Sequence, residues 1–353
     1  MQRALVTGSG GLIGSACATR LLEAGWAVTG VDNDLRAWFF GPAGSTAASI
    51  RGLSDRWPLY THSGLDLRNR KGVAALLRGL RPEFIIHTAA QPSHDRAAAI
   101  PAEDFDVNAG ATVNLLLAAR SFAPEAPFCF TSTNKVYGDR PNTLPLRELP
   151  TRFDYADGRD GIAEDMPVDQ CLHSLFGASK LAADVLCQEY GRYFGMPIGI
   201  FRGGCLTGPQ HAGVELHGYL NYIVRCAVLG DPYTVYGYQG KQVRDQIHAA
   251  DVADLFLAFH AAPRCGEVYN LGGGRSNSLS VLETISALRD CGLSLKWSYR
   301  DQPRTGDHIC YISDLTKLRS HFPAWRPCRD LPSILDEMIS HFRSHLPTAR
   351  LAA

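Results

Sequence analysis

Short apolar, β-branched runs alternate with longer amphipathic stretches of helical periodicity through the first two hundred residues. Strands that alternate with helices at this spacing form βαβ units and a parallel sheet. Because such crossovers are right-handed, the pattern predicts an α/β fold with a Rossmann-like, doubly wound parallel sheet. The expected strands are 4–7, 27–31, 84–88 and 128–132, and the expected helices are 13–24, 72–79, 107–121 and 174–194.

The pattern changes in the second half of the chain. Irregular segments containing Gly, His and Tyr separate two helical stretches between residues 202 and 240. We expect a smaller C-terminal α/β domain there, with one strand–helix piece near 234–260 returning to the main sheet. Residues 139–170 lack periodicity, and a loop of that length inside a compact domain is usually functional.

Composition indicates a soluble globular protein. The 353 residues are 45% hydrophobic and 20% charged, so disorder is not expected to be the main state. Lys plus Arg and Asp plus Glu both number 35, and this balance argues against nucleic-acid binding driven by bulk charge. The 10 cysteines show neither CxxC nor Cys/His ligand spacing, so we expect no metal site. Without an apolar signal region or a membrane-spanning run, a cytoplasmic protein with no membrane partner is expected.

A glycine-rich turn follows the first expected strand. Gly8, Gly11 and Gly14 are spaced G-x-x-G-x-x-G, with Leu12 and Ile13 opening the next helix. Such a turn lets the backbone approach a pyrophosphate and presents amide groups at a helix N-terminus. The position between a strand and a helix therefore predicts a dinucleotide site.

Acidic and small residues follow the next strands. Asp32 can accept hydrogen bonds from both ribose hydroxyls and repels a 2′-phosphate, which favours NAD over NADP. Arg36 nearby leaves NADP open as an alternative. Asp66 could hold the adenine amino group. Small side chains at Thr88-Ala89-Ala90 would let a nucleotide lie across the strand ends.

Several further motifs follow in order. They are S-T-N-K-V-Y-G at 132–138, a lysine four residues after Phe176, R-D-Q-I-H-A-A-D at 244–251 and R-T-G-D at 304–307. With them the chain resembles, over nearly its whole length, the extended short-chain dehydrogenase/reductases that act as nucleotide-sugar epimerases and dehydratases. Its motif strings are most similar to those of the branch that epimerises carbon 2 of CDP-hexoses.

The resemblance implies a tightly held NAD that removes a hydride from a sugar carbinol, after which the ketone is reduced from its other face. It implies a nucleotide-sugar as ligand and a homodimer or tetramer, paired through the helices at 107–121 and 174–194. It also adds cofactor contacts at Asn33, Leu67, Asn108 and Lys180.

The reaction centre departs from the family pattern. A hydroxyl, a phenol and an ammonium normally cooperate there; the first matches Thr133 and the last matches Lys180, but the phenol position holds Phe176. Phenylalanine cannot accept or donate a proton, and loss of general-base help typically costs about 10²–10⁴ in rate. Another group could replace the phenol, the chemistry could differ, or the protein could bind its ligands without turnover.

Candidates for the replacement group contain a phenol, a thiol or an imidazole. They are Tyr137, Cys171, His173, His211 and His217. Each also has a purely structural interpretation: Tyr137 as a packing residue beyond a strand end, His173 as a helix-orienting residue, and the other two histidines as solvated loop residues. Cys171 would need a lowered pKa to act as a base.

The substrate side is expected to hold a sugar and a diphosphate. By resemblance, Arg244 and Arg304 contact the diphosphate, which suits guanidinium groups because they make paired hydrogen bonds to phosphate. Related 4,6-dehydratases carry an acid pair where this chain has Asn134 and Lys135, so elimination of water is disfavoured. Tyr219 or Tyr222 could stack on the nucleobase or belong to the core. The other substrate-side candidates are Gln91, His173, Arg202, Gly203, His211 and His217.

These features define an expected domain organisation. Residues 1–201 plus 234–262 should form the NAD-binding domain, residues 202–233 plus 263–345 the nucleotide-sugar domain, and residues 346–353 a frayed tail. The function expected is an NAD-dependent nucleotide-sugar epimerase acting at carbon 2 of a CDP-hexose through a transient ketone. The alternatives are another nucleotide-sugar oxidoreductase, 4-epimerase or dehydratase adapted to Phe176, and a non-catalytic NAD/nucleotide-sugar binding protein.

Overall fold

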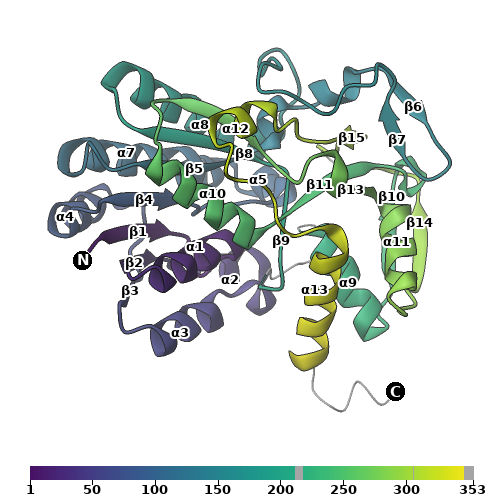
Figure 1. Ribbon diagram of the computed structural model, residues 1–353, viewed down its shortest axis with the longest axis horizontal. Helices are drawn as coiled ribbons and strands as arrows, with labels where there is room; N and C mark the ends of the chain where they lie inside the picture. Colours follow the sequence, from purple (N-terminus) through teal and green to yellow (C-terminus); the bar gives the residue numbers. More distant parts are fainter. Residues whose placement is uncertain (211–217, 305, 346–353) are drawn as a thin grey trace.

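The main body of the molecule is a parallel sheet with helices on both faces (Figure 1). The computed structural model describes residues 1–210, 218–304 and 306–345. Within these ranges, seven strands pair in the order β12-β8-β5-β4-β1-β2-β3, which confirms the expected Rossmann-like, doubly wound sheet. The strands are β1 (Arg3–Thr7), β2 (Ala27–Val31), β3 (Tyr60–Ser63), β4 (Phe84–His87), β5 (Phe128–Thr133), β8 (Ile198–Gly203) and β12 (Glu267–Leu271).

Both faces of this sheet are buried, as expected for parallel strands covered by crossover helices. Successive side chains of β1 alternate between two apolar cores: Ala4 and Val6 belong to one, and Leu5 belongs to the other. The first core lies against α1 (Leu12–Glu23), α3 (Ala47–Arg56) and α10 (Ala249–Ala261). The second lies against α4 (Arg70–Leu80), α7 (Ala111–Phe122) and α8 (Ser174–Phe194).

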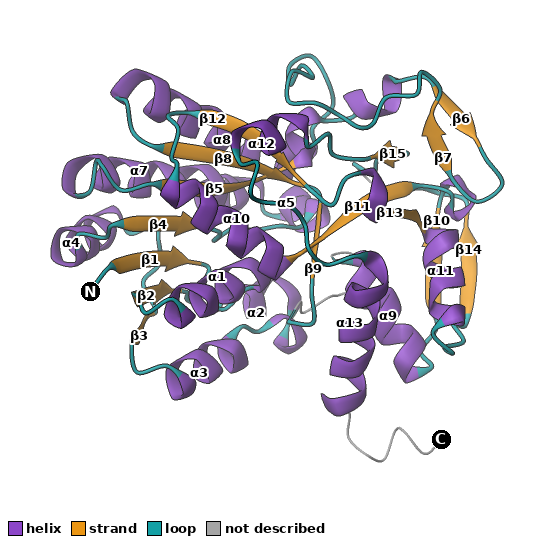
Figure 2. Ribbon diagram, in the orientation of Figure 1, coloured by secondary structure: helices purple, strands orange, loops and turns teal. Residues whose placement is uncertain are grey.

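The second half of the chain builds a separate layer of small sheets beside the main body (Figure 2). Strand β11 (Val243–His248) pairs with β9 (Cys205–Thr207), β13 (Ser278–Ser280) and β15 (Cys310–Tyr311). Strand β10 (Tyr233–Tyr236) pairs with β14 (Trp297–Arg300). A third apolar core joins β10 to α9 (Tyr219–Leu229), α11 (Val281–Asp290) and α13 (Leu331–His345).

The expectation that the piece near 234–260 returns to the main sheet is correct for its helix and wrong for its strand. Helix α10 packs on α1 against the main sheet, but β11 forms its ladder with the small strands β9, β13 and β15. The strand that does join the main sheet is β12, which pairs with β8 over residues 267–271. Both β12 (EVYNL) and β11 (VRDQIH) mix apolar with polar residues, so their sequences alone do not distinguish the strand that joins the main sheet.

The remaining elements are short. They are α2 (Leu35–Phe40), α5 (His94–Ala99), α6 (Pro101–Phe105), α12 (Thr316–His321) and the hairpin of β6 (Leu146–Glu148) with β7 (Phe153–Tyr155). The hairpin lies within residues 139–170, where the sequence showed no periodicity. The helix expected at 107–121 starts as a π-helical turn at 106–110 before α7 begins. No helix of the described part of the chain is both long and apolar enough to cross a membrane.

Candidate active site

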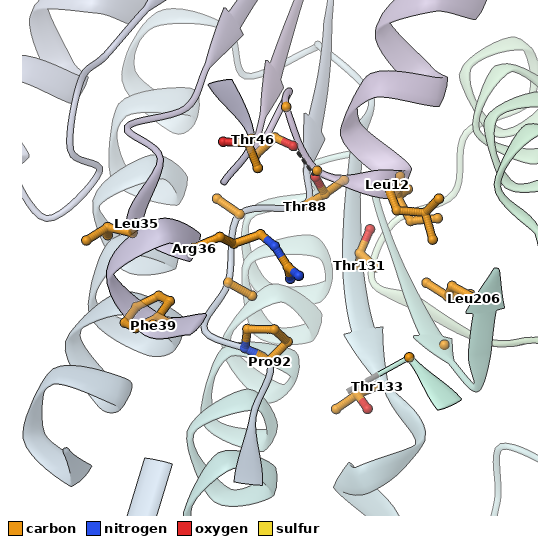
Figure 3. Close-up of a pocket in the computed structure, with 18 of the residues that line it drawn as sticks. Leu12, Leu35, Arg36, Phe39, Thr46, Thr88, Pro92, Thr131, Thr133 and Leu206 are labelled. Carbon is orange, nitrogen blue, oxygen red and sulfur yellow. Dashed lines mark hydrogen bonds between the residues drawn. The ribbon is translucent and has the colours of Figure 1, made fainter. Parts of the chain in front are cut away.

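A cavity of about 690 Å³ opens at the carboxyl ends of the main-sheet strands, between that sheet and the β9–β11 layer. In a doubly wound fold, ligands bind at this edge, where the strand order reverses. The cavity wall begins at the β1–α1 turn, continues along the ends of β4 and β5, and reaches Arg244 and Arg304 at its far end. Figure 3 shows part of this wall, with Leu12, Thr88, Thr131 and Thr133 around the central space.

The β1–α1 turn is shaped by close backbone contacts. Gly8 has φ +67°, and a Cβ there would lie 2.7 Å from the amide nitrogen of Ala89. A Cβ on Gly14 would overlap the carbonyl of Gly8. The N-cap residue Gly11 has no capping side chain, so the first amides of α1 are left for a ligand. This cradle fits the pyrophosphate of a dinucleotide.

Asp32 lies in the cavity wall at the end of β2, where its carboxylate is held by neighbouring donors. It accepts hydrogen bonds from the backbone N–H of Gly10 at 2.9 Å, the N–H of Asp34 at 2.9 Å and the Thr46 hydroxyl at 3.0 Å. Arg36 lines the same end, and its guanidinium points into the space between Thr88 and Pro92 (Figure 3). Asp32 is therefore oriented by the fold before any ribose arrives.

Other predicted cofactor residues divide into two groups. Asp66 lines the cavity, and its ion pair with Arg68 at 2.7 Å lowers the pKa of the Asp66 carboxyl. Asn108 is instead buried behind the wall, where its amide donates to Asp104 at 3.1 Å and to Ser179 at 3.0 Å. The remaining wall residues at this end are Leu12, Ile13, Asn33, Leu67, Thr88, Ala89 and Ala90.

Thr133, Phe176 and Lys180 all line the cavity wall. The Lys180 Nζ donates to the carbonyl of Thr131 at 2.8 Å and lies 4.3 Å from the centre of the Phe130 ring. Burial lowers the pKa of Lys180 to about 8. The hydroxyl of Thr133, the ammonium of Lys180 and the apolar ring of Phe176 therefore share one wall.

Three predicted replacements for the phenol, Tyr137, Cys171 and His173, lie outside the described cavity wall. The Tyr137 hydroxyl donates to Asn270 Oδ1 at 2.8 Å, and burial raises its pKa to about 12. The Cys171 thiol donates to the Tyr137 carbonyl at 3.5 Å, and desolvation raises its pKa. His173 Nε2–H donates to the Val136 carbonyl at 2.9 Å. The other two candidates, His211 and His217, lie outside the described residues.

The structure brings a different imidazole to the site. His94, the first residue of α5, lines the cavity, and its ring meets the Phe176 ring at a centroid distance of 5.1 Å and an angle of 73°. His94 Nδ1 lies 2.7 Å from the Ser174 hydroxyl. The sequence carries no motif that marks His94, because its approach to Phe176 spans more than eighty residues.

The far end of the cavity is rich in cations. Lys135 is half-buried, and desolvation lowers its pKa to about 8; its Nζ donates to the carbonyl of Gly306 at 3.0 Å. Arg244 forms an ion pair with Asp307, and Arg304 lies over the Tyr236 ring at 4.9 Å. Clustered cations with one carboxylate among them suit a diphosphate.

Some of the predicted substrate residues line the cavity, and others are buried behind its wall. Asn134 and Gly203 line the cavity, as does Tyr219, whereas Tyr222 packs against the third core. Arg202 does not reach the cavity: it is buried in an ion pair with Asp184 at 3.0 Å. Gln91 is also buried, donating to Asp104 at 2.6 Å.

Two polar atoms of the wall lack a partner. Thr131 Oγ1 and Gln246 Oε1 are buried without a hydrogen-bond partner among the described residues, and both side chains line the cavity. Buried polar atoms are normally hydrogen-bonded. Both atoms are shielded from solvent, so each carries an uncompensated desolvation cost in this wall.

Comparison with known proteins agrees with this geometry. A CDP-paratose 2-epimerase from Salmonella typhi is 31% identical over 334 residues, which are 92% of this chain and 95% of that protein. A dTDP-glucose 4,6-dehydratase from Neisseria meningitidis is 27% identical, covering 97% of this chain and 93% of that protein. The solved UDP-glucose 4-epimerase of Thermus thermophilus in complex with NAD superposes with a TM-score of 0.79 at 26% identity, over 98% of this chain and 100% of that one.

Residues 4–272 match the family described as NAD dependent epimerase/dehydratase. This match confirms the resemblance seen in the sequence and confirms NAD as the cofactor. The chain therefore belongs to the NAD-dependent epimerase/dehydratase family.

Proposed function

We propose that the protein is a nucleotide-sugar epimerase that inverts carbon 2 of a CDP-hexose through a transient ketone. The observation that carries this proposal is the continuity of the cavity. The glycine turn at one end, the Thr133–Lys180 pair in the middle and Arg244 with Arg304 at the far end all face the same space. A nucleotide-sugar spans that distance with its sugar between the cofactor and the arginines. The 31% identity to a CDP-paratose 2-epimerase supports the carbon-2 assignment.

Each part of the wall has a task in this reaction. When bound, NAD supplies the hydride acceptor beside the sugar. The first amides of α1 and the Asp32 carboxylate hold its pyrophosphate and ribose. Lys180 provides positive charge at the nicotinamide end, and the Thr133 hydroxyl hydrogen-bonds the reacting sugar oxygen. The Arg244 and Arg304 guanidiniums neutralise the substrate diphosphate.

Epimerisation is favoured over dehydration by the two residues that follow Thr133. Elimination of water needs an acid and a base near the leaving hydroxyl. Asn134 has no acidic proton to give, so the acid–base pair is incomplete, and Lys135 Nζ donates one of its protons to the Gly306 carbonyl. An ammonium in that position instead stabilises negative charge on the sugar oxygen.

A second candidate function is binding of NAD and a nucleotide-sugar without turnover. The observation in its favour is Phe176, an apolar ring in the cavity wall beside Lys180. Under this alternative the site would still bind NAD and the nucleotide-sugar, but it could not transfer the proton of the sugar hydroxyl. A nucleotide-sugar oxidoreductase, a 4-epimerase or a dehydratase adapted to Phe176 would differ in the product formed.

The test is to incubate the purified protein with CDP-, UDP-, GDP- and dTDP-hexoses. The absorbance of reduced nicotinamide and the stereochemistry of the recovered sugar are measured. We expect a carbon-2 epimer from a CDP-hexose. A carbon-4 epimer or loss of water would contradict the carbon-2 assignment. Ligand-induced thermal stabilisation without reduced nicotinamide or a new sugar would favour the binding protein.

We also propose a homodimer formed through α7 and α8. Leu175 and Val185 on α8 are 49% and 43% exposed, and the family resemblance implies pairing of these helices. Light scattering should give twice the 38.5 kDa chain mass, whereas a mass near 38.5 kDa would contradict the dimer.

A further inference from the structure

We propose that His94, held by Ser174, is the general base that replaces the missing phenol and takes the proton from the reacting sugar hydroxyl. This inference rests on the proposed epimerase function and names the group that makes the chemistry possible without a tyrosine. It is carried by three contacts of His94, with Phe176, Ser174 and Gly306.

The first contact places an imidazole beside the ring that stands in the phenol position. His94 and Phe176 both line the cavity, and their rings meet edge to face at 5.1 Å between centroids. Phe176 is 6% exposed, so its ring is fixed by packing. It therefore acts as a wall that holds the imidazole on the cavity side.

The second contact orients the imidazole. His94 Nδ1 lies 2.7 Å from Ser174 Oγ, which also accepts the N–H of Gly177 at 3.3 Å. In the tautomer whose Nδ1–H donates to Ser174, Nε2 carries the lone pair, and it makes no hydrogen bond to any described residue. Ser174 has φ +60°, a conformation that non-glycine residues rarely adopt and that proteins keep mainly at functional positions.

The third contact closes the site over the imidazole. A Cβ on Gly306 would lie 2.9 Å from His94 Cε1 and Nδ1, so only a glycine allows this approach. The Gly306 carbonyl also accepts from Lys135 Nζ at 3.0 Å. One loop residue therefore holds the proposed base on one side and a cation on the other.

Every proton and electron pair of the proposed oxidation has a donor and an acceptor in this site. The C–H bond of the carbinol breaks and its electron pair leaves as the hydride that NAD accepts. The O–H bond breaks, its proton moves to His94 Nε2, and the electron pair left on oxygen forms the carbonyl. On return of the hydride to the opposite face, Nε2 gives the same proton back to the oxygen.

The charges that face His94 keep it in the required state. Burial and the Lys135 ammonium lower its pKa to about 3, and the Asp307 carboxylate acts in the opposite direction. The imidazole is therefore neutral throughout the ordinary pH range, and because its basicity is low it takes the proton only in concert with departure of the hydride. Lys135 could not serve, because its Nζ holds its proton below about pH 8.

The test compares formation of reduced nicotinamide in a single turnover by wild type, His94→Asn, Phe176→Tyr and the double variant His94→Asn/Phe176→Tyr. Loss of a general base should slow His94→Asn by about 10²–10⁴-fold, with unchanged thermal stabilisation by NAD. The double variant should regain rate, because a phenol beside Lys180 supplies the missing proton acceptor. Its rate should fall with falling pH as the phenol protonates, whereas the wild-type rate should show no loss from His94 protonation between pH 8 and pH 5.

His321→Gln is the matched control. Its Nδ1 also pairs with a hydroxyl, that of Tyr269 at 2.9 Å, but its ring packs on Tyr269 and Phe322 in the first core. This variant should turn over at the wild-type rate. Equal rates in wild type and His94→Asn would overturn the assignment of the base while leaving the epimerase proposal standing.

Two other outcomes separate the proposals. Reduced nicotinamide in Phe176→Tyr alone, with none in wild type, would overturn the role of His94 but keep the family chemistry. No reduction in either protein would overturn the epimerase function for the sugars tested and the base with it. Nitrogen NMR of the imidazoles adds a test independent of turnover: an Nδ1–H tautomer is expected for His94, and an Nε2–H tautomer would contradict the proposal.

Discussion

The two ends of the cavity differ in whether backbone or side chains form the ligand contacts. At the cofactor end the contacts are made by backbone, namely the close turn at Gly8 and the uncapped amides of α1, with Asp32 only 24 residues further on. At the sugar end they are made by side chains from five separate segments. Those side chains belong to His94, Lys135, Phe176, Arg244 and Arg304. A site built from close backbone contacts cannot accept a larger side chain. A wall built from side chains can have one residue replaced by another of similar size and keep its shape.

The electrostatics of the two ends differ in the same way. Asp32 has its hydrogen bonds satisfied locally. In the middle and at the sugar end of the cavity, desolvation lowers the pKa values of Lys180 and Lys135 to about 8. Two desolvated ammoniums are an unfavourable arrangement that a polyanionic ligand relieves. The sugar end is therefore the part of the site whose charge state depends on what is bound.

Lys180→Met should have the largest effect and tests the reaction centre directly. The variant removes the positive charge beside the nicotinamide and the hydrogen bond to the Thr131 carbonyl. Loss of a preorganised electrostatic group of this kind typically lowers kcat by about 10²–10³-fold. Steady-state kinetics measure it, with Lys71→Met on the exposed surface of α4 as the control. A kcat within twofold of wild type would show that Lys180 has no part in turnover.

Gly14→Val tests the backbone-built end. Its side chain would overlap the carbonyl of Gly8 and force the turn open. We expect NAD affinity to fall roughly 100-fold, which corresponds to about 2.7 kcal/mol. Calorimetric titration measures it. The control is Gly79→Ala, because a Cβ there meets nothing within 4 Å; it should bind NAD as wild type does. Unchanged NAD affinity in Gly14→Val would show that the β1–α1 turn does not bind the dinucleotide.

Arg244→Gln tests the far wall. Hydrogen bonds to charged groups contribute about 1.5–3 kcal/mol, so KM for the nucleotide-sugar should rise about 10- to 100-fold with kcat less affected. Arg275→Gln is the matched control, since Arg275 also pairs with an aspartate, Asp154 at 3.0 Å, but lies outside the described cavity wall. Equal KM values in the two variants would remove Arg244 from the substrate site.

The smallest effect is a pH dependence of stability from Lys135. Its folded pKa, about 8, lies below its ordinary value of 10.5. Between these values the unfolded chain binds more protons than the folded one, so this lysine's contribution to stability rises with pH in that window. Denaturant unfolding of wild type and Lys135→Met at pH 8 and pH 10 measures it. Wild type should gain stability relative to the variant; a constant difference would show that the lysine is not desolvated.

Much of the cofactor end could be predicted from the sequence because its signals are local. A glycine spacing between a strand and a helix fixes where backbone amides point, and the acid at the end of the next strand follows from the same βαβ unit. The alternation of apolar and helical segments determined the doubly wound sheet for the same reason. The prediction failed at β11, because the partners of a strand are set by tertiary packing and not by the residues of the strand alone.

At the sugar end, the tertiary structure determined which side chains line the cavity. The sequence named Thr133, Phe176 and Lys180 from one motif pair, but it could not tell that Arg202 is buried against Asp184 or that Tyr137 is bonded to Asn270. It gave no sign of His94, which reaches Phe176 and Gly306 only when α5, α8 and the loop before β15 converge. Spacing along the chain determines backbone conformation over a few residues. Which side chains meet across eighty or two hundred residues depends on how the layers pack, and that packing places the imidazole in the site.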